Sequence, residues 1–128
     1  MKYYISKTLS IGFESAVEKV TESLKKEGFG VLTEINLQEK LKEKLNVDLR
    51  KYKILGACNP AYAYKAIQQE DKIGTMLPCS VIIQELDNNK IEVAAVDPVA
   101  SMMAVENPTL SGIAGEIREK LKRVIASL

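Results

Sequence analysis

The sequence predicts a two-layer α+β sandwich, and three observations lead to it. First, 128 residues with 46% hydrophobic and 27% charged side chains are typical of one soluble domain, here residues 1–128. Second, five segments are rich in the alternating, β-branched or apolar residues of strands. Third, two long segments carry apolar residues on one helical face. Because each helix must bury that face, we expect both on one side of a curved, mainly antiparallel five-stranded sheet.

The first half of the chain alternates strands with helices. Residues 3–9 are the first predicted strand, and the first long helix follows, with its apolar stripe at positions 13, 16, 17, 20 and 24. Residues 29–35 alternate as a second strand. Asn36 with Glu39 resembles a capping box that begins a short helix. Residues 50–58 form the third strand, whose wholly apolar end suggests a strand covered there on both faces.

Asn59 and Pro60 begin the next helix in this interpretation. Asn is preferred at the N-cap, and Pro is preferred at the first helical position. We predict a helix from Pro60 to about Gln69. The side-chain oxygen of Asn59 is expected to accept a backbone N–H two or three residues further on.

The last third of the chain predicts a hairpin, a loop and a long helix. The hairpin strands are residues 79–86 and 91–96. Residues 97–107 are expected to be an unusually apolar loop, containing Val99, Met102, Met103 and Val105. The final helix has apolar residues at positions 110, 113, 114, 117, 121, 124 and 128. The predicted order is therefore β-α-β-(short α)-β-α-β-β-α.

Composition excludes several classes of function. A net charge of +1 gives no field that would attract nucleic acid or an anionic membrane. The chain has no histidine, which excludes Ser-His-Asp and Cys-His nucleophile systems. Residues 1–7 turn polar before a signal-peptide core could form, so we expect a cytoplasmic protein with reduced thiols.

Cys58 and Cys79 are the remaining candidates for chemistry. They lie 21 positions apart, which fits neither a C-x-x-C redox motif nor a complete zinc set. Cys58 directly precedes a predicted helix start, where the helix N-terminus stabilises a thiolate. Cys79 follows Pro78 and opens the next strand, so both thiols could lie near one end of the sheet. The alternative is that both are small buried hydrophobic residues.

Several segments resemble a known family of bacterial and archaeal proteins, the domain of unknown function numbered 302. The resemblance begins at Tyr52–Pro60 and Met76–Val81, and within these segments ILGACNP (residues 54–60) and LPCSV (residues 77–81) are the specific parts. The similarity covers nearly the whole chain and extends to these further positions: residues 10–13, Ala63, Ala66, residues 73–74, Asp97-Pro98, Met102 and residues 107–110. The resemblance implies a curved antiparallel sheet backed by two helices, an architecture like that of the TATA-box-binding protein. That likeness is one of fold and gives no reason to infer DNA binding.

The resemblance implies homodimers and no established activity, and it leaves two hypotheses open. In the first, the chain is a small, non-catalytic, homodimeric binding domain. Its site for a small molecule or partner would lie at the following residues: Cys58, Asn59, Pro60, Pro78, Cys79, Asp97 and Met102. In the second, Cys58 and Cys79 act in thiol redox chemistry or bind a soft metal such as Cu(I) or Zn, with Met102 or Met103 assisting. The sequence identifies no cofactor.

Overall fold

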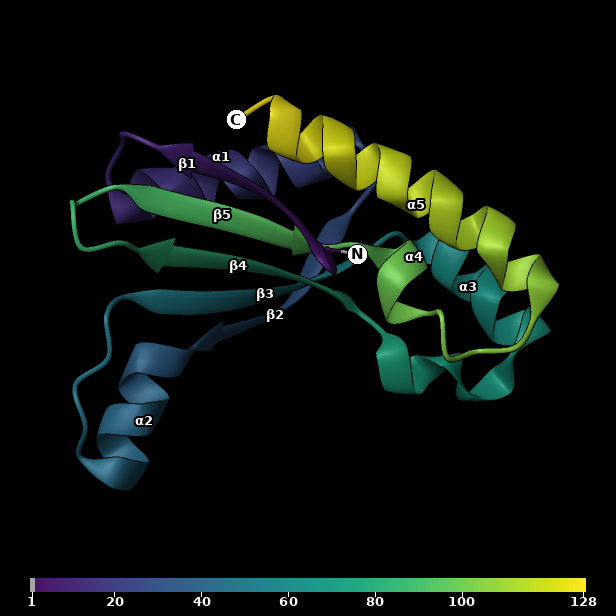
Figure 1. Cartoon of the computed structure of the whole chain (residues 1–128), viewed down its shortest axis with the longest axis horizontal. Helices are drawn as coiled ribbons and strands as arrows, with labels where there is room; N and C mark the ends of the chain where they lie inside the picture. The colour runs from purple at the N-terminus through teal and green to yellow at the C-terminus, as the bar shows by residue number, and fades with distance from the viewer. Residues whose placement is uncertain (1) are drawn as a thin grey trace.

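A computed structural model describes residues 2–128 as a five-stranded sheet with helices packed against it (Figure 1). In chain order the elements are β1 (Tyr4–Leu9), α1 (Phe13–Lys26), β2 (Gly30–Asn36), α2 (Leu37–Leu45), β3 (Tyr52–Cys58), α3 (Pro60–Gln69), the 3₁₀ helix η1 (Asp71–Met76), β4 (Cys79–Glu85), β5 (Ile91–Val96), α4 (Pro98–Ser101) and α5 (Pro108–Ala126). The predicted α+β class and element order are confirmed.

The strands are arranged in the order β1-β5-β4-β3-β2, and every neighbouring pair is antiparallel. The two edges of the sheet are therefore β1 and β2, and β4 lies at its centre. The register between β2 and β3 shifts once, between Val31 and Thr33. Leu32 is the extra residue at this bulge, and its side chain is exposed.

The two long helices α1 and α5 cover one face of the sheet, as predicted. Figure 1 shows α1 behind the strands and α5 running along the same side. The sheet residues beneath them are almost completely buried, for example Leu55, Val81 and Val93. This main core is built from alternate residues of each strand, which is the period of two expected when one sheet face is covered.

A second, smaller cluster lies at the end of the sheet where α3, η1 and α4 gather (Figure 1). The segment predicted as a loop contains the short helix α4, which differs from expectation. Asp97 caps α4 by accepting from the N–H of Val99, so Asp97-Pro98 is a helix start like Asn59-Pro60. Met102 packs against the smaller cluster and Met103 stays 67% exposed.

The opposite face of the sheet has no helix in front of it in the view of Figure 1. The helix α2 lies apart from the main body, and none of its residues is buried. Within residues 2–128, no helix has both the length and the apolar character needed to cross a bilayer.

Candidate functional site

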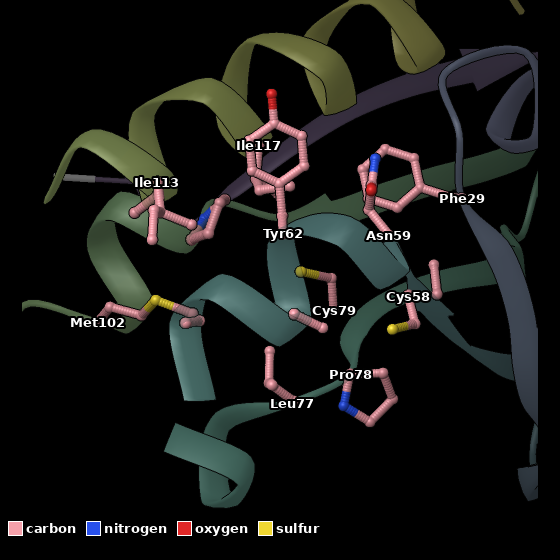
Figure 2. Close-up of a pocket in the computed structure, with 15 residues that line it drawn as sticks. Phe29, Cys58, Asn59, Tyr62, Leu77, Pro78, Cys79, Met102, Ile113 and Ile117 are labelled. Carbon is pink, nitrogen blue, oxygen red and sulfur yellow. The ribbon is translucent and has the colours of Figure 1, made fainter. Parts of the chain in front are cut away.

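A small cavity lies where β3 and β4 meet α3, α4 and α5 (Figure 2). Its volume is about 30 Å³, enough for roughly two water molecules. Of the seven residues predicted for the site, five line this cavity: Cys58, Asn59, Pro78, Cys79 and Met102. Pro60 and Asp97 do not line it, although each flanks a residue that does. All seven predicted site residues therefore lie in the wall of this cavity or next to a wall residue, and the other ten wall residues were not predicted for the site.

The rest of the wall is apolar or aromatic and comes mainly from the helices. These residues are Phe29, Ala57, Tyr62, Ala63, Ala66, Leu77, Pro98, Ile113, Ala114 and Ile117. Several of them were predicted to lie on the apolar faces of helices, but the sequence did not predict that they would line one cavity. The three-dimensional crossing of α3 with α5 does this, and no local sequence pattern encodes that crossing.

Cys79 points into the main core. Cys79 is 8% exposed, and its Sγ is directed toward Tyr62 in Figure 2. Burial, with a smaller contribution from Cys58, raises the pKa of the Cys79 thiol from an ordinary 9.0 to about 11. The thiol is therefore neutral at physiological pH and behaves as a small hydrophobic group.

Cys58 points the other way. Ala57 pairs with Cys79 across the two strands, so these residues share a face, and alternation turns Cys58 to the opposite face. Figure 2 agrees, because the Sγ of Cys58 is directed toward Pro78. Two cysteines whose Cβ directions diverge cannot be bridged without backbone movement. Both are free thiols in the structure.

Asn59 is at the N-cap of α3 as predicted, but its side chain makes no capping hydrogen bond. The predicted acceptance of a backbone N–H is therefore wrong. Instead, Asn59 Nδ2 donates to the carbonyl oxygen of Glu27 at 3.3 Å. Glu27 ends α1, and Gly28 follows it with φ +86°. The side chain of Asn59 is therefore directed to the end of α1, and its hydrogen bond links α1 to α3.

Asp97 is buried and serves a structural purpose. Its Oδ1 accepts from the N–H of Val99, and its Oδ2 accepts from Arg118 Nε at 3.0 Å. Its own N–H donates to the carbonyl of Tyr3. Both oxygens of the carboxylate are thus occupied by partners from α4 and α5, which fixes α4 beside the cavity.

The close approach of Pro78 to β3 shapes the strand end. A Cβ at Gly56 would lie 2.8 Å from Pro78 Cγ, and Thr33 also contacts this position. Gly56 is therefore required by space on the open face of the sheet. The Leu77-Pro78 peptide bond is cis.

The chemistry available in the cavity is limited. No Asp, Glu, Lys or Arg side chain lines it. Among residues 2–128, no group of three or more Cys, Asp or Glu side chains is placed to hold a metal ion. The cavity is suited to receiving a small apolar group rather than to stabilising a developing charge.

A second hollow, which the sequence analysis missed, lies on the open face of the sheet. Its volume is about 450 Å³, within the range of ligand pockets of roughly 300–1,000 Å³. It is lined by Tyr3, Tyr4, Tyr52, Ser80, Ile82, Gln84, Glu92, Ala94, Ala95 and Val96. Ile82 of β4 could have indicated it, because it lies between Val81 and Ile83, which face the core.

Comparisons with known proteins agree on one family. The model of the family described as "Domain of unknown function DUF302" matches residues 5–128. A crystal structure titled as an uncharacterized conserved protein DUF302 from Bacillus stearothermophilus superimposes with a TM-score of 0.91. It is 28% identical in sequence, and the alignment covers 98% of each chain. No curated protein matches the chain. On this evidence the chain belongs to the DUF302 family.

Proposed function

We propose that this protein is a non-catalytic, homodimeric binding domain that accepts a small apolar ligand, or the apolar end of a larger one, in the cavity beside Cys79. The observation that carries the proposal is the wall of the cavity. Fifteen residues from several elements converge on one space, and the walls are almost entirely apolar.

The absence of charged side chains in the wall supports a non-catalytic role. General acid-base or nucleophilic catalysis needs a titratable group near the reacting atoms. Three titratable side chains line the cavity, those of Cys58, Tyr62 and Cys79, and of these only Cys79 is buried. The raised pKa of its thiol keeps it protonated at neutral pH. As part of the same proposal, the protein acts in the cytoplasm and binds neither nucleic acid nor membrane, in keeping with its net charge of +1.

The small volume limits the ligand. About 30 Å³ admits a group of one or two heavy atoms, so a larger apolar ligand requires the wall to open. The wall segment with the least support is the turn after α4, where Met102 is half-buried and Met103 is exposed. Flexible methionine side chains adapt readily to irregular apolar ligands.

Xenon is a suitable probe because it enters small, dry, apolar cavities. We expect saturable shifts of the Ile113 and Ala114 methyl resonances under xenon pressure. Ala66→Val, which fills the cavity wall, should abolish them. Ala61→Val is the matched control, since Ala61 is exposed on the same helix. Native mass spectrometry of gently purified protein should show an added mass that Ala66→Val lacks. Equal xenon shifts in Ala66→Val and Ala61→Val would contradict the proposed site.

A thiol or soft-metal function remains the alternative, but the opposite directions of Cys58 and Cys79 weigh against it. The observation in its favour is that Cys58 is half-buried beside the N-terminus of a ten-residue helix. Alkylation with iodoacetamide at neutral pH tests this role. Modification of Cys58 in the folded protein would favour a thiol role, and modification only in denaturant would exclude that role.

A further inference from the structure

Within residues 2–128, no helix covers the open face of the sheet, where a row of mainly apolar residues crosses the five strands. Across the strands this row consists of Ser6, Ala94, Ile82, Ile54 and Ile35, and each neighbouring pair is matched in register. Ile35 is 42% exposed, and Ile54 and Ile82 are half-buried. A solvated face of an antiparallel sheet is ordinarily polar, so this row requires a partner surface.

We propose that a second copy of this chain packs on this face, related by a twofold axis that runs along β4. The inference rests on the homodimer in the proposed function and adds the surface and the geometry. It is independent of the ligand cavity, which lies toward the other face.

Side-chain size along the rows is complementary under that rotation. A twofold axis along β4 lays the β3 side of one copy over the β5 side of the other. In the central row this places Ile54 over Ala94 and Ile35 over Ser6 of the second copy, so large residues meet small ones. Ile82 lies on the axis and meets its own copy.

The adjoining row adds a second pairing about the same axis. Tyr4 is next to Val96 on the β5 side, and Thr33 is next to Gly56 on the β3 side. The same rotation places the exposed Tyr4 over the exposed Thr33, so a large residue again meets a small one, as an isologous interface requires. Gly56 adds no hollow to this row, because Pro78 and Thr33 already occupy the space over it.

The charges obey the same symmetry. Arg50 Nε donates to Gln84 Oε1 at 2.8 Å, and Gln84 Nε2 donates to Glu92 Oε1 at 2.7 Å. Arg50 thus lies on the β3 side of β4, and Glu92 lies on the β5 side. Rotation about β4 brings Arg50 of each copy toward Glu92 of the other, giving two equivalent ion pairs. An axis across the strands would instead set Glu92 against Val96.

The size of the face is sufficient for a modest interface. Five strands about 4.8 Å apart, each about six residues long at roughly 3.3 Å per residue, span a flat area of about 480 Å². Side chains standing on it present more accessible surface, which approaches the roughly 600 Å² per partner of a small specific interface. Face-to-face sheets also pack with their strands within about 30° of each other.

Sedimentation equilibrium and a reciprocal charge reversal test the proposal. Wild type should be dimeric at micromolar concentration. Ile82→Arg should raise the dimer Kd by about 100-fold or more, because it places two like charges on the axis. Ile67→Arg is the control, since Ile67 is exposed on α3 away from this face, and it should have no effect. Circular dichroism checks that each variant is folded.

Arg50→Glu and Glu92→Arg should each be monomeric alone, because each places like charges across the axis twice. Mixed in equal amounts, they should form a heterodimer with both ion pairs restored. A wild-type dimer that is indifferent to Ile82→Arg and to both charge changes would overturn this interface and leave the homodimer standing. A monomeric wild type would overturn both. Neither result alters the xenon test of the cavity.

Discussion

The two faces of the sheet are formed by the same strands, but the long helices α1 and α5 pack against only one of them. Leu55 is completely buried beneath the helices, whereas Ile54, one residue earlier, stands half-buried on the open face. The same holds for Val81 and Ile82 in β4. The apolar end of β3 predicted a strand covered on both faces, whereas the helices of this chain cover only one of them. The difference teaches that an unbroken apolar run shows both faces to be apolar, but not that one chain covers both.

The faces also differ in polarity. The covered face ends in a cavity without charged side chains, and the open face carries the hydrogen-bonded series Arg50, Gln84 and Glu92. An apolar cavity selects a ligand by shape and size, whereas ordered charges select a partner by orientation. The two surfaces are thus suited to different kinds of recognition.

The largest expected effect comes from neighbouring substitutions on the two faces. Leu55→Ala should lower the free energy of unfolding by about 2–5 kcal/mol, because it leaves a cavity in the main core. Ile54→Ala should lower it by about 1 kcal/mol at dilute protein, because the side chain is already half in water. Urea unfolding at several protein concentrations provides the measurement.

Repeating the measurement at several protein concentrations should separate Ile54→Ala from Leu55→Ala more clearly. If Ile54 contacts a second copy, the effect of Ile54→Ala should grow as concentration rises, since association stabilises only the folded wild type. The effect of Leu55→Ala should show a weaker dependence. Equal losses for both substitutions at every concentration would break the distinction between the faces.

Much of the covered face could be predicted from the sequence, because helix and strand periodicity encode which side of an element is apolar. The stripes of α1 and α5 and the helix start at Pro60 follow from such local rules. The directions of Cys58 and Cys79 did not follow, because they depend on the register that pairs Ala57 with Cys79. That register is a long-range property of two strands.

The open face could not be predicted for a different reason. The pattern of β3 and β4 shows that residues such as Ile54 and Ile82 are apolar, but not whether a helix of the same chain reaches them. The side chain of Asn59 was likewise misassigned because its acceptor, the carbonyl of Glu27, lies 32 positions away. Local preference gives way when tertiary structure offers another partner.

Titration of Cys79 should give the next largest effect. Its folded pKa of about 11 lies above the ordinary 9.0, so burial of the neutral thiol contributes stability that is fully present below pH 9. This contribution is lost as the pH rises from 9 to 11, since only the unfolded thiol then ionises. The expected loss is about 2–3 kcal/mol relative to Cys79→Ala.

Urea unfolding at pH 8, 9, 10 and 11 measures this loss. Subtracting the curve for Cys79→Ala removes the titration of lysines and tyrosines. Cys58→Ala serves as the matched control and should keep most of the fall, because burial is the main cause of the raised Cys79 pKa and Cys58 contributes less. Parallel pH profiles for wild type and Cys79→Ala would show that Cys79 is not held in a dry environment.

Gly56 tests the crowding on the open face. Gly56→Ala should lower the free energy of unfolding by about 1–3 kcal/mol, because the new Cβ would overlap Thr33 Oγ1 and lie 2.8 Å from Pro78 Cγ. Gly30→Ala is the control, since a Cβ there meets nothing within 4 Å. Thermal unfolding compares the two. Similar melting temperatures for both variants would mean that the Thr33 hydroxyl and Pro78 can both move away from this position.

The smallest effect separates two helix starts of the same type. Asn107 caps α5 by accepting from the N–H of Thr109 at 3.1 Å, and its Nδ2 also donates to the carbonyl of Gln69 at 2.9 Å. Asn107→Ala should therefore lower the free energy of unfolding by about 1–2 kcal/mol. Asn59→Ala removes only the 3.3 Å bond to Glu27 and should lower it by about 0.5 kcal/mol. Urea unfolding of the two variants shows whether Asn59 caps α3 or only links it to α1. If Asn59 were a cap, Asn59→Ala would lower the free energy of unfolding as much as Asn107→Ala.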